Sequence, residues 1–167
     1  KQEDLGDWTG ALTSYEAVLN IDRSLQFARD GRKRVQLLAK TIRDMEAYIK
    51  DPFVLSEDRI FAEANTLLSK AQEIENAGSA YRGMLTEYST LLANAAIPII
   101  LVLISDNETE ITIHKYGELG SFERHEIHLR PGRYTIVGSR DGWRDVRKEI
   151  ILESTLNPVT IHCHETR

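Results

Sequence analysis

The sequence predicts an α+β fold of two units, in which an antiparallel array of α-hairpins precedes a small antiparallel β-sandwich. Three observations predict this class. Residues 1–95 are rich in helix formers, and their apolar members recur every three or four positions. Residues 96–167 instead alternate β-branched with polar residues, and Gly and Pro separate the short runs. The single cysteine, Cys163, permits no intrachain disulfide, so each unit must be held by its apolar core.

The first half divides into four amphipathic helices. Ser24 and Ser56 stand where hydroxyl caps would begin the second and the third helix. Asp51-Pro52 is expected to end the second helix, because a residue before proline avoids the helical region. Gly78 is expected to end the third. The predicted helices cover residues 9–21, 24–50, 57–77 and 80–93.

The second half predicts about six short strands at the regular spacing that is typical of a β-sandwich or barrel. Turns are expected at residues 105–107, at Gly117–Gly120, at Pro131-Gly132 and at Asp141-Gly142. In the Pro131-Gly132 turn, proline would fix the first turn angle and glycine would supply a positive φ. The predicted strands cover residues 99–104, 110–116, 122–129, 134–137, 143–152 and 159–164.

The start of the chain carries a spaced pattern of small and aromatic residues. Gly6-Asp7-Trp8-Thr9-Gly10-Ala11-Leu12 leads to Tyr15-Glu16-Ala17 and then to Leu19-Asn20-Ile21-Asp22. This pattern resembles the second helix of a tetratricopeptide repeat, in which a small residue lets a neighbouring helix approach and an aromatic fills the gap beyond. Arg23 stands where such repeats usually carry proline, so we describe residues 1–95 as a tetratricopeptide-like helical segment.

A second pattern lies in the β half. Leu129-Arg130-Pro131-Gly132-Arg133-Tyr134-Thr135-Ile136 is followed by Asp141-Gly142-Trp143. These residues resemble a PEGA-type domain, a small transthyretin-like β-sandwich, although the name-giving Pro-Glu-Gly-Ala tetrapeptide is absent. The resemblance implies a binding domain of the kind appended to bacterial envelope or signalling proteins. It carries over no catalytic residue.

The candidate binding residues form two small groups. Trp143, with Arg140 and Arg144 beside it, follows a turn, where an exposed aromatic ring is suited to a partner contact. Packing of the ring in the core and a cross-strand charge ladder are the favoured alternatives for this group. Arg32 and Lys33 belong to a basic run in the second helix, for which a solvated helix face is the favoured alternative.

His162 and His164 are the candidate metal ligands. They share one face of the last predicted strand because side chains alternate along a strand, and such a pair can ligate zinc or copper. The sequence supplies no assignable third ligand. We therefore expect no metal and no cofactor, with a solvated histidine face and Cys163 directed into the core.

Composition and motifs together exclude several functions. A net charge of −5 argues against non-specific nucleic-acid binding. No apolar run reaches the roughly 20 residues of a membrane span. The chain begins at Lys1 inside an amphipathic pattern, so we expect a fragment of a longer protein. There is no phosphate-binding loop, nucleophile elbow or His-Glu-x-x-His motif, and we expect no enzyme activity in this fragment.

The resulting prediction is a non-catalytic protein-interaction or assembly module of a bacterial envelope-associated protein. Its partner is expected to be a protein or a cell-wall or envelope component. Its location is expected to be periplasmic or membrane-anchored extracytoplasmic, with a cytoplasmic location as the alternative. The alternative function is the regulatory or sensor C-terminal region of a larger signalling enzyme, such as a membrane-bound serine/threonine protein kinase. The full-length gene would distinguish the two.

Overall fold

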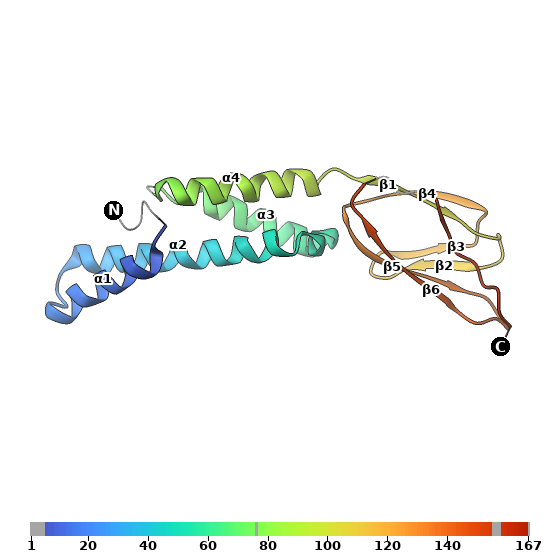
Figure 1. Ribbon diagram of the computed structural model, residues 1–167, viewed down its shortest axis with the longest axis horizontal. Coiled ribbons are helices and arrows are strands. Elements are labelled where there is room, and N and C mark those ends of the chain that lie inside the picture. Colours follow the sequence, from blue (N-terminus) through green and yellow to red (C-terminus); the bar gives the residue numbers. More distant parts are fainter. Residues whose placement is uncertain (1–5, 76, 155–157, 167) are drawn as a thin grey trace. The chain divides into compact units, whose positions relative to one another are not determined.

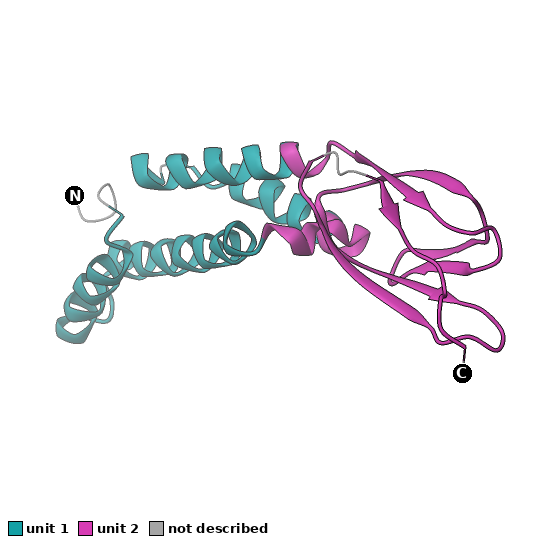
Figure 2. Cartoon of the chain, turned by 45° about the vertical axis from the view of Figure 1, so that its right-hand side comes forward, with its two compact units in different colours: residues 1–51, 62–93 teal, residues 52–61, 94–167 magenta. Residues whose placement is uncertain are grey.

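The computed structural model describes residues 6–75, 77–154 and 158–166. In this part of the chain, four α-helices and one 3₁₀ turn lead into seven β-strands, so the predicted α+β class with two units is confirmed (Figure 1). One unit comprises Lys1–Asp51 with Ala62–Ala93, and the other Pro52–Phe61 with Asn94–Arg167 (Figure 2). A single boundary after residue 95 was expected. The structure instead groups residues 52–61 with the strands, because these residues contact β5.

The helices follow the predicted apolar stripes, but their ends differ from the prediction. Ser24 does not cap the second helix, because its N–H and hydroxyl both donate to Asp22 Oδ1, at 2.8 and 2.6 Å. Gly78 does not end the third helix but begins the fourth. Asp51 ends the second helix, as expected. The observed elements are α1 (Trp8–Ile21), α2 (Gln26–Lys50), the 3₁₀ turn η2 (Pro52–Ser56), α3 (Asp58–Gln72) and α4 (Gly78–Ala95).

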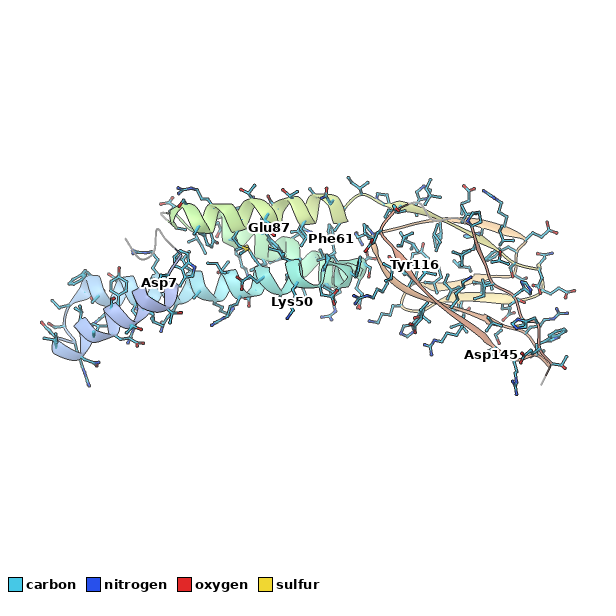
Figure 3. The ribbon with its side chains drawn as sticks, in the orientation of Figure 1. Asp7, Lys50, Phe61, Glu87, Tyr116 and Asp145 are labelled. Atoms are coloured by element: carbon cyan, nitrogen blue, oxygen red, sulfur yellow. The ribbon has the colours of Figure 1, made fainter. Side chains whose placement is uncertain are left out.

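Helix α1 begins at a side-chain cap. Asp7, labelled in Figure 3, accepts a hydrogen bond at Oδ1 from the Gly10 N–H at 2.9 Å. This bond satisfies one of the N–H groups that a helix start leaves without a partner. A side chain at Gly10 would overlap the Asp7 carboxylate, so the capped turn also depends on the glycine.

Removing this cap is expected to destabilise the helical unit by about 1 kcal/mol. The change is Asp7→Ala, and the free energy of unfolding from urea titrations is the measurement. Asp7→Asn is the control, since its amide oxygen can still accept the Gly10 hydrogen bond. Equal losses for the two variants would show that the carboxylate charge, and not the cap, stabilises this end of the helix.

Small residues bring the helices together. A Cβ at Gly31 of α2 would overlap the ring of Tyr15 of α1, so the tyrosine lies directly against the α2 backbone. Ala11, one turn earlier on α1, is buried. The small residue that lets the two helices approach at Tyr15 is therefore Gly31 of α2.

Two tyrosines join α4 to α3 in the same manner. Tyr81 donates its hydroxyl to the Ala71 carbonyl and Tyr88 donates to the Ala64 carbonyl, each at 3.0 Å. The partners are seven residues apart on both helices and run in opposite directions, which is the register of an antiparallel pair. Both alanines are fully buried, and a larger residue there would hold the rings away from the α3 backbone.

The strands form two sheets that face each other. One sheet has the order β4-β1-β7 and the other β3-β2-β5-β6. All pairings are antiparallel except that of β1 with β7. Leu101 and Leu103 of one sheet share a core with Ile111, Ile113 and Ile136 of the other. The strands are β1 (Ile99–Ile104), β2 (Glu110–Ile113), β3 (Gly117–Gly120), β4 (Arg124–Leu129), β5 (Gly132–Ser139), β6 (Val146–Leu152) and β7 (Val159–Thr160).

Two glycine predictions in the β unit are wrong, for different reasons. Gly117–Gly120 forms the short edge strand β3 instead of a turn, and Lys115, with φ of 65°, lies in the turn that precedes it. Gly132 does not adopt a positive φ and instead begins β5. A Cβ at Gly132 would overlap Ser56 of η2, so the glycine is required for close approach. Gly142 does have a positive φ, of 79°, as its turn demands.

Candidate functional site

The structure brings Trp143, Arg140 and Arg144 together beside the turn that precedes β6. The Trp143 N–H donates to the Arg140 carbonyl at 3.0 Å, which closes the turn. The Arg140 guanidinium carbon lies 4.7 Å from the centre of the Trp143 ring, a cation–π distance. Both side chains are half-buried. Trp143 is thus neither a core residue nor a fully solvated one, and one side of its ring is held by Arg140.

Two acidic residues from another loop fix Arg140. Its guanidinium forms ion pairs with Asp106, at 3.7 Å, and with Glu108. Asp106 Oδ1 in turn accepts hydrogen bonds from the N–H groups of Glu108 and Thr109, at 3.0 and 2.8 Å. The buried Thr109 hydroxyl donates to Asp106 Oδ2 at 3.1 Å and accepts from the Cys163 N–H at 3.1 Å. A continuous polar chain therefore connects the surface at Arg140 to the core.

The hydrogen bonds at Asp106 determine its protonation. Burial opposes ionisation of the carboxyl, but the N–H groups of Glu108 and Thr109 and the Thr109 hydroxyl outweigh it and lower the Asp106 pKa to about 2. The carboxylate is therefore charged under all ordinary conditions. It acts here as a fixed anchor for Arg140 and not as a proton donor.

Because the Asp106 pKa is lowered in the folded state, the stability of the fold is expected to decrease at low pH. A carboxyl with a lowered pKa in the folded state stabilises the fold above its unfolded pKa, and that stability is lost as the pH falls through the folded pKa. For Asp106 the loss is expected between pH 3.8 and about 2. Urea unfolding at several pH values should show a steeper decline for the wild type than for Asp106→Asn. Glu108→Gln is the matched control, and parallel curves for wild type and Asp106→Asn would contradict the expectation.

Arg144 contacts Glu165, near the end of the chain, and so connects that segment to the same turn. Its Nη1 lies 3.1 Å from Glu165 Oε2, and its N–H donates to the Glu165 carbonyl at 2.7 Å. An isolated β-bridge joins Trp143 to Thr166. The ion pairs of Arg140 and Arg144 thus connect separate segments of the β unit. The charge-ladder alternative, which involved Asp141, Asp145 and Glu149, stays a prediction.

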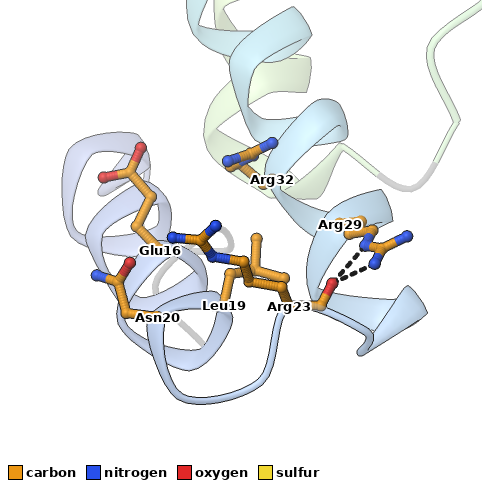
Figure 4. A pocket seen from close by; sticks show the side chains of 6 residues that line it. All are labelled: Glu16, Leu19, Asn20, Arg23, Arg29 and Arg32. Atoms are coloured by element: carbon orange, nitrogen blue, oxygen red, sulfur yellow. Dashed lines mark hydrogen bonds between the residues drawn. The ribbon is translucent and has the colours of Figure 1, made fainter.

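The second predicted group separates into two environments. Arg32 lines a hollow near the end of α1, together with Arg23 and Arg29 (Figure 4). Lys33 is exposed and is not part of that lining. The two adjacent basic residues therefore differ in surroundings, although the sequence treats them as one run.

The histidines at the chain end do not form a larger cluster. The centres of the His162 and His164 rings are 6.3 Å apart, and both residues are exposed. Cys163 between them is buried, as the alternation of side chains predicted. Within residues 6–75, 77–154 and 158–166, no three His, Cys, Asp or Glu side chains are grouped so that they could hold a metal ion.

Sequence reasoning missed the acidic partners of this surface, namely Asp106, Glu108 and Glu165, and the linking residue Thr109. A local signal was present for one of them. An aspartate that precedes a threonine by three residues often accepts hydrogen bonds from the following backbone. Such a pattern predicts a rigid acidic loop at residues 106–109, but it does not say which arginine the loop meets.

A search for membrane-spanning helices over the described residues finds none of sufficient length and apolar character. Comparison with known proteins finds no family model that matches the chain and no curated protein whose sequence matches it. The two family likenesses therefore stay predictions.

Proposed function

We propose that this chain is a non-catalytic protein-interaction or assembly module of a bacterial envelope-associated protein. The observation that supports the proposal best is the surface formed by Trp143, Arg140 and Arg144. Tryptophan and arginine are the residue types most enriched among the energetically dominant residues of protein interfaces. The Arg140 guanidinium lies against the Trp143 ring, so the two present one amphipathic contact surface.

The surface is held in place before any partner arrives. Asp106 and Glu108 pair with the half-buried Arg140, and Glu165 pairs with the exposed Arg144. A partner therefore has fewer rotatable side chains to order on binding, which lowers the entropic cost of association. The assignment to the bacterial envelope rests on the resemblance of residues 129–143 to PEGA-type domains, and the partner class we favour is a protein.

Site-specific photo-crosslinking in the cells that encode the full-length protein tests this function. A photoreactive residue at position 144 is expected to give a discrete protein adduct, and mass spectrometry would identify the partner. Position 118, which is exposed on β3, is the control and should give none. Trp143→Ala should abolish the adduct at position 144. Equal labelling at 144 and 118, or an adduct that survives Trp143→Ala, would contradict the proposal.

A further inference from the structure

A hollow of about 490 Å³ lies between the last turns of α1 and the first turns of α2, within the helical unit (Figure 4). Arg23, Arg29 and Arg32 supply three guanidinium groups to its lining, and Glu16 supplies one carboxylate. Three positive charges less one negative charge leave a formal charge of +2 on the lining residues, and the Asp22 carboxylate lies close enough to Arg29 to interact with it from outside the lining. Each guanidinium group is a planar, positively charged group with several hydrogen-bond donors.

One donor on a residue that lines the hollow is left without a partner. Arg32 Nε is buried, and no atom of the described residues accepts its hydrogen bond. An unsatisfied buried donor on a charged group is costly, so the folded chain gains when an acceptor occupies the adjacent space. This observation is independent of the charge count, and it points to a ligand that carries acceptor oxygens.

The surrounding groups are arranged before binding. Arg29 Nε donates to the Arg23 carbonyl at 2.7 Å, and Arg29 Nη2 donates to the same oxygen, so the turn and the first part of α2 are fastened together (Figure 4). Leu25 occupies the N-cap position before α2 and makes no side-chain cap hydrogen bond. The positive end of the α2 dipole lies at this hollow, but so does the negative end of the α1 dipole, so the arginine side chains supply the positive charge.

We propose that this hollow binds a doubly charged oxyanion, a phosphate group, through Arg23 and Arg32 beside Arg29. A dianion neutralises the formal charge of +2, whereas a carboxylate leaves half of it. The guanidinium fork matches phosphate oxygens with two parallel hydrogen bonds, and tetrahedral oxygens can meet donors from several sides at once. The site belongs to the helical unit and does not depend on the Trp143 surface.

Isothermal titration calorimetry of the full chain at constant ionic strength tests the site, with inorganic phosphate and O-phosphoserine as the probes. The decisive pair of variants is Arg32→Gln and Lys33→Gln, which remove the same charge from adjacent positions of α2. Loss of a charged hydrogen bond is expected to weaken phosphate binding by about tenfold in Arg32→Gln. Lys33→Gln should leave the affinity within about twofold of wild type, because an exposed charge outside the hollow is screened.

Arg23→Gln provides a second test that does not disturb the packed helices, since Arg23 is exposed in the turn. It should also weaken binding while the thermal unfolding curve stays unchanged. Binding of inorganic phosphate would support a free ion as ligand, and binding of O-phosphoserine alone would support a phosphate ester. The proposal is overturned if neither probe binds, if acetate competes as well as phosphate, or if Lys33→Gln weakens binding as much as Arg32→Gln does.

Discussion

Replacing Tyr88 with alanine is expected to destabilise the helical unit by about 3–5 kcal/mol, the usual cost of deleting a large buried aromatic side chain. Tyr88 is fully buried between α3 and α2. Its hydroxyl donates to the Ala64 carbonyl, and its ring centre lies 6.0 Å from that of Tyr48. Because whole domains are stable by only about 5–15 kcal/mol, a loss of this size would unfold a large fraction of the protein on mild heating. Urea titration followed by circular dichroism at 222 nm (the helical signal) measures it.

Tyr88→Phe separates the ring from the hydroxyl. The ring still fills the space over Ala64, and only the hydrogen bond to the carbonyl is lost, so the expected cost is about 1 kcal/mol. Burial raises the pKa of the Tyr88 hydroxyl, so the group remains a donor at every pH used for the titration. A Tyr88→Phe variant as unstable as Tyr88→Ala would mean that the hydrogen bond, and not the packed ring, holds α4 to α3.

The fold class and most elements were predictable because they follow from spacing within single segments. The apolar stripe of α2 and the break at Asp51-Pro52 require no knowledge of the rest of the chain. Strand β3 was missed because its two glycines suggest a turn. Both do adopt a positive φ, of 145° at Gly117 and 75° at Gly120, yet the segment still pairs with β2. Grouping of residues 52–61 with the strands was also beyond the sequence, since it depends on contacts between segments that lie more than 50 positions apart.

In the candidate site too, the features within one segment were predictable and the contacts between segments were not. Trp143, Arg140 and Arg144 surround one turn, so sequence reasoning grouped them and the structure places them together. Their acidic partners come from the loop before β2 and from the chain end. Nothing in the charge pattern decides between these acids and those that are nearer in the sequence, namely Asp141, Asp145 and Glu149. The hollow at Arg32 could not be predicted from the sequence either. Burial of the Arg32 Nε depends on how α1 packs against α2, and this is a contact between separate segments.

Residues 52–61 contact the β unit through many weak interactions and one tight fit. Arg130 pairs with Asp58 and lies 4.3 Å from the Phe61 ring centre, and Arg133 lies 4.9 Å from that of Phe53. Exposed ion pairs and cation–π contacts each contribute little, typically about 1 kcal/mol or less. The close approach of Gly132 to Ser56 is different, because the Ser56 side chain packs against the Gly132 backbone without space for a methyl group.

Gly132→Ala is therefore expected to destabilise the β unit by about 1–3 kcal/mol, the usual cost of overpacking a buried position. The new Cβ would overlap the Ser56 Cβ, and its next nearest neighbours are the Ser56 Oγ at 2.8 Å and the Phe53 carbonyl oxygen at 3.4 Å. Because the Ser56 side chain supplies the two closest atoms, Ser56→Gly should recover most of the loss when combined with Gly132→Ala. The free energy of unfolding of all four proteins, measured by urea titration with tryptophan fluorescence, gives the coupling between the two sites.

Ser56→Ala distinguishes the steric explanation from loss of a hydrogen bond. The Ser56 hydroxyl donates to the Phe53 carbonyl at 2.8 Å, and alanine removes that bond while keeping the Cβ. Gly132→Ala should thus remain destabilising in the Ser56→Ala background and become nearly neutral in the Ser56→Gly background. Equal coupling in both backgrounds would assign the cost to the hydroxyl. Absence of coupling in both would mean that residues 52–61 move away from β5 freely, and the grouping of this helical turn with the β unit would then have no energetic basis.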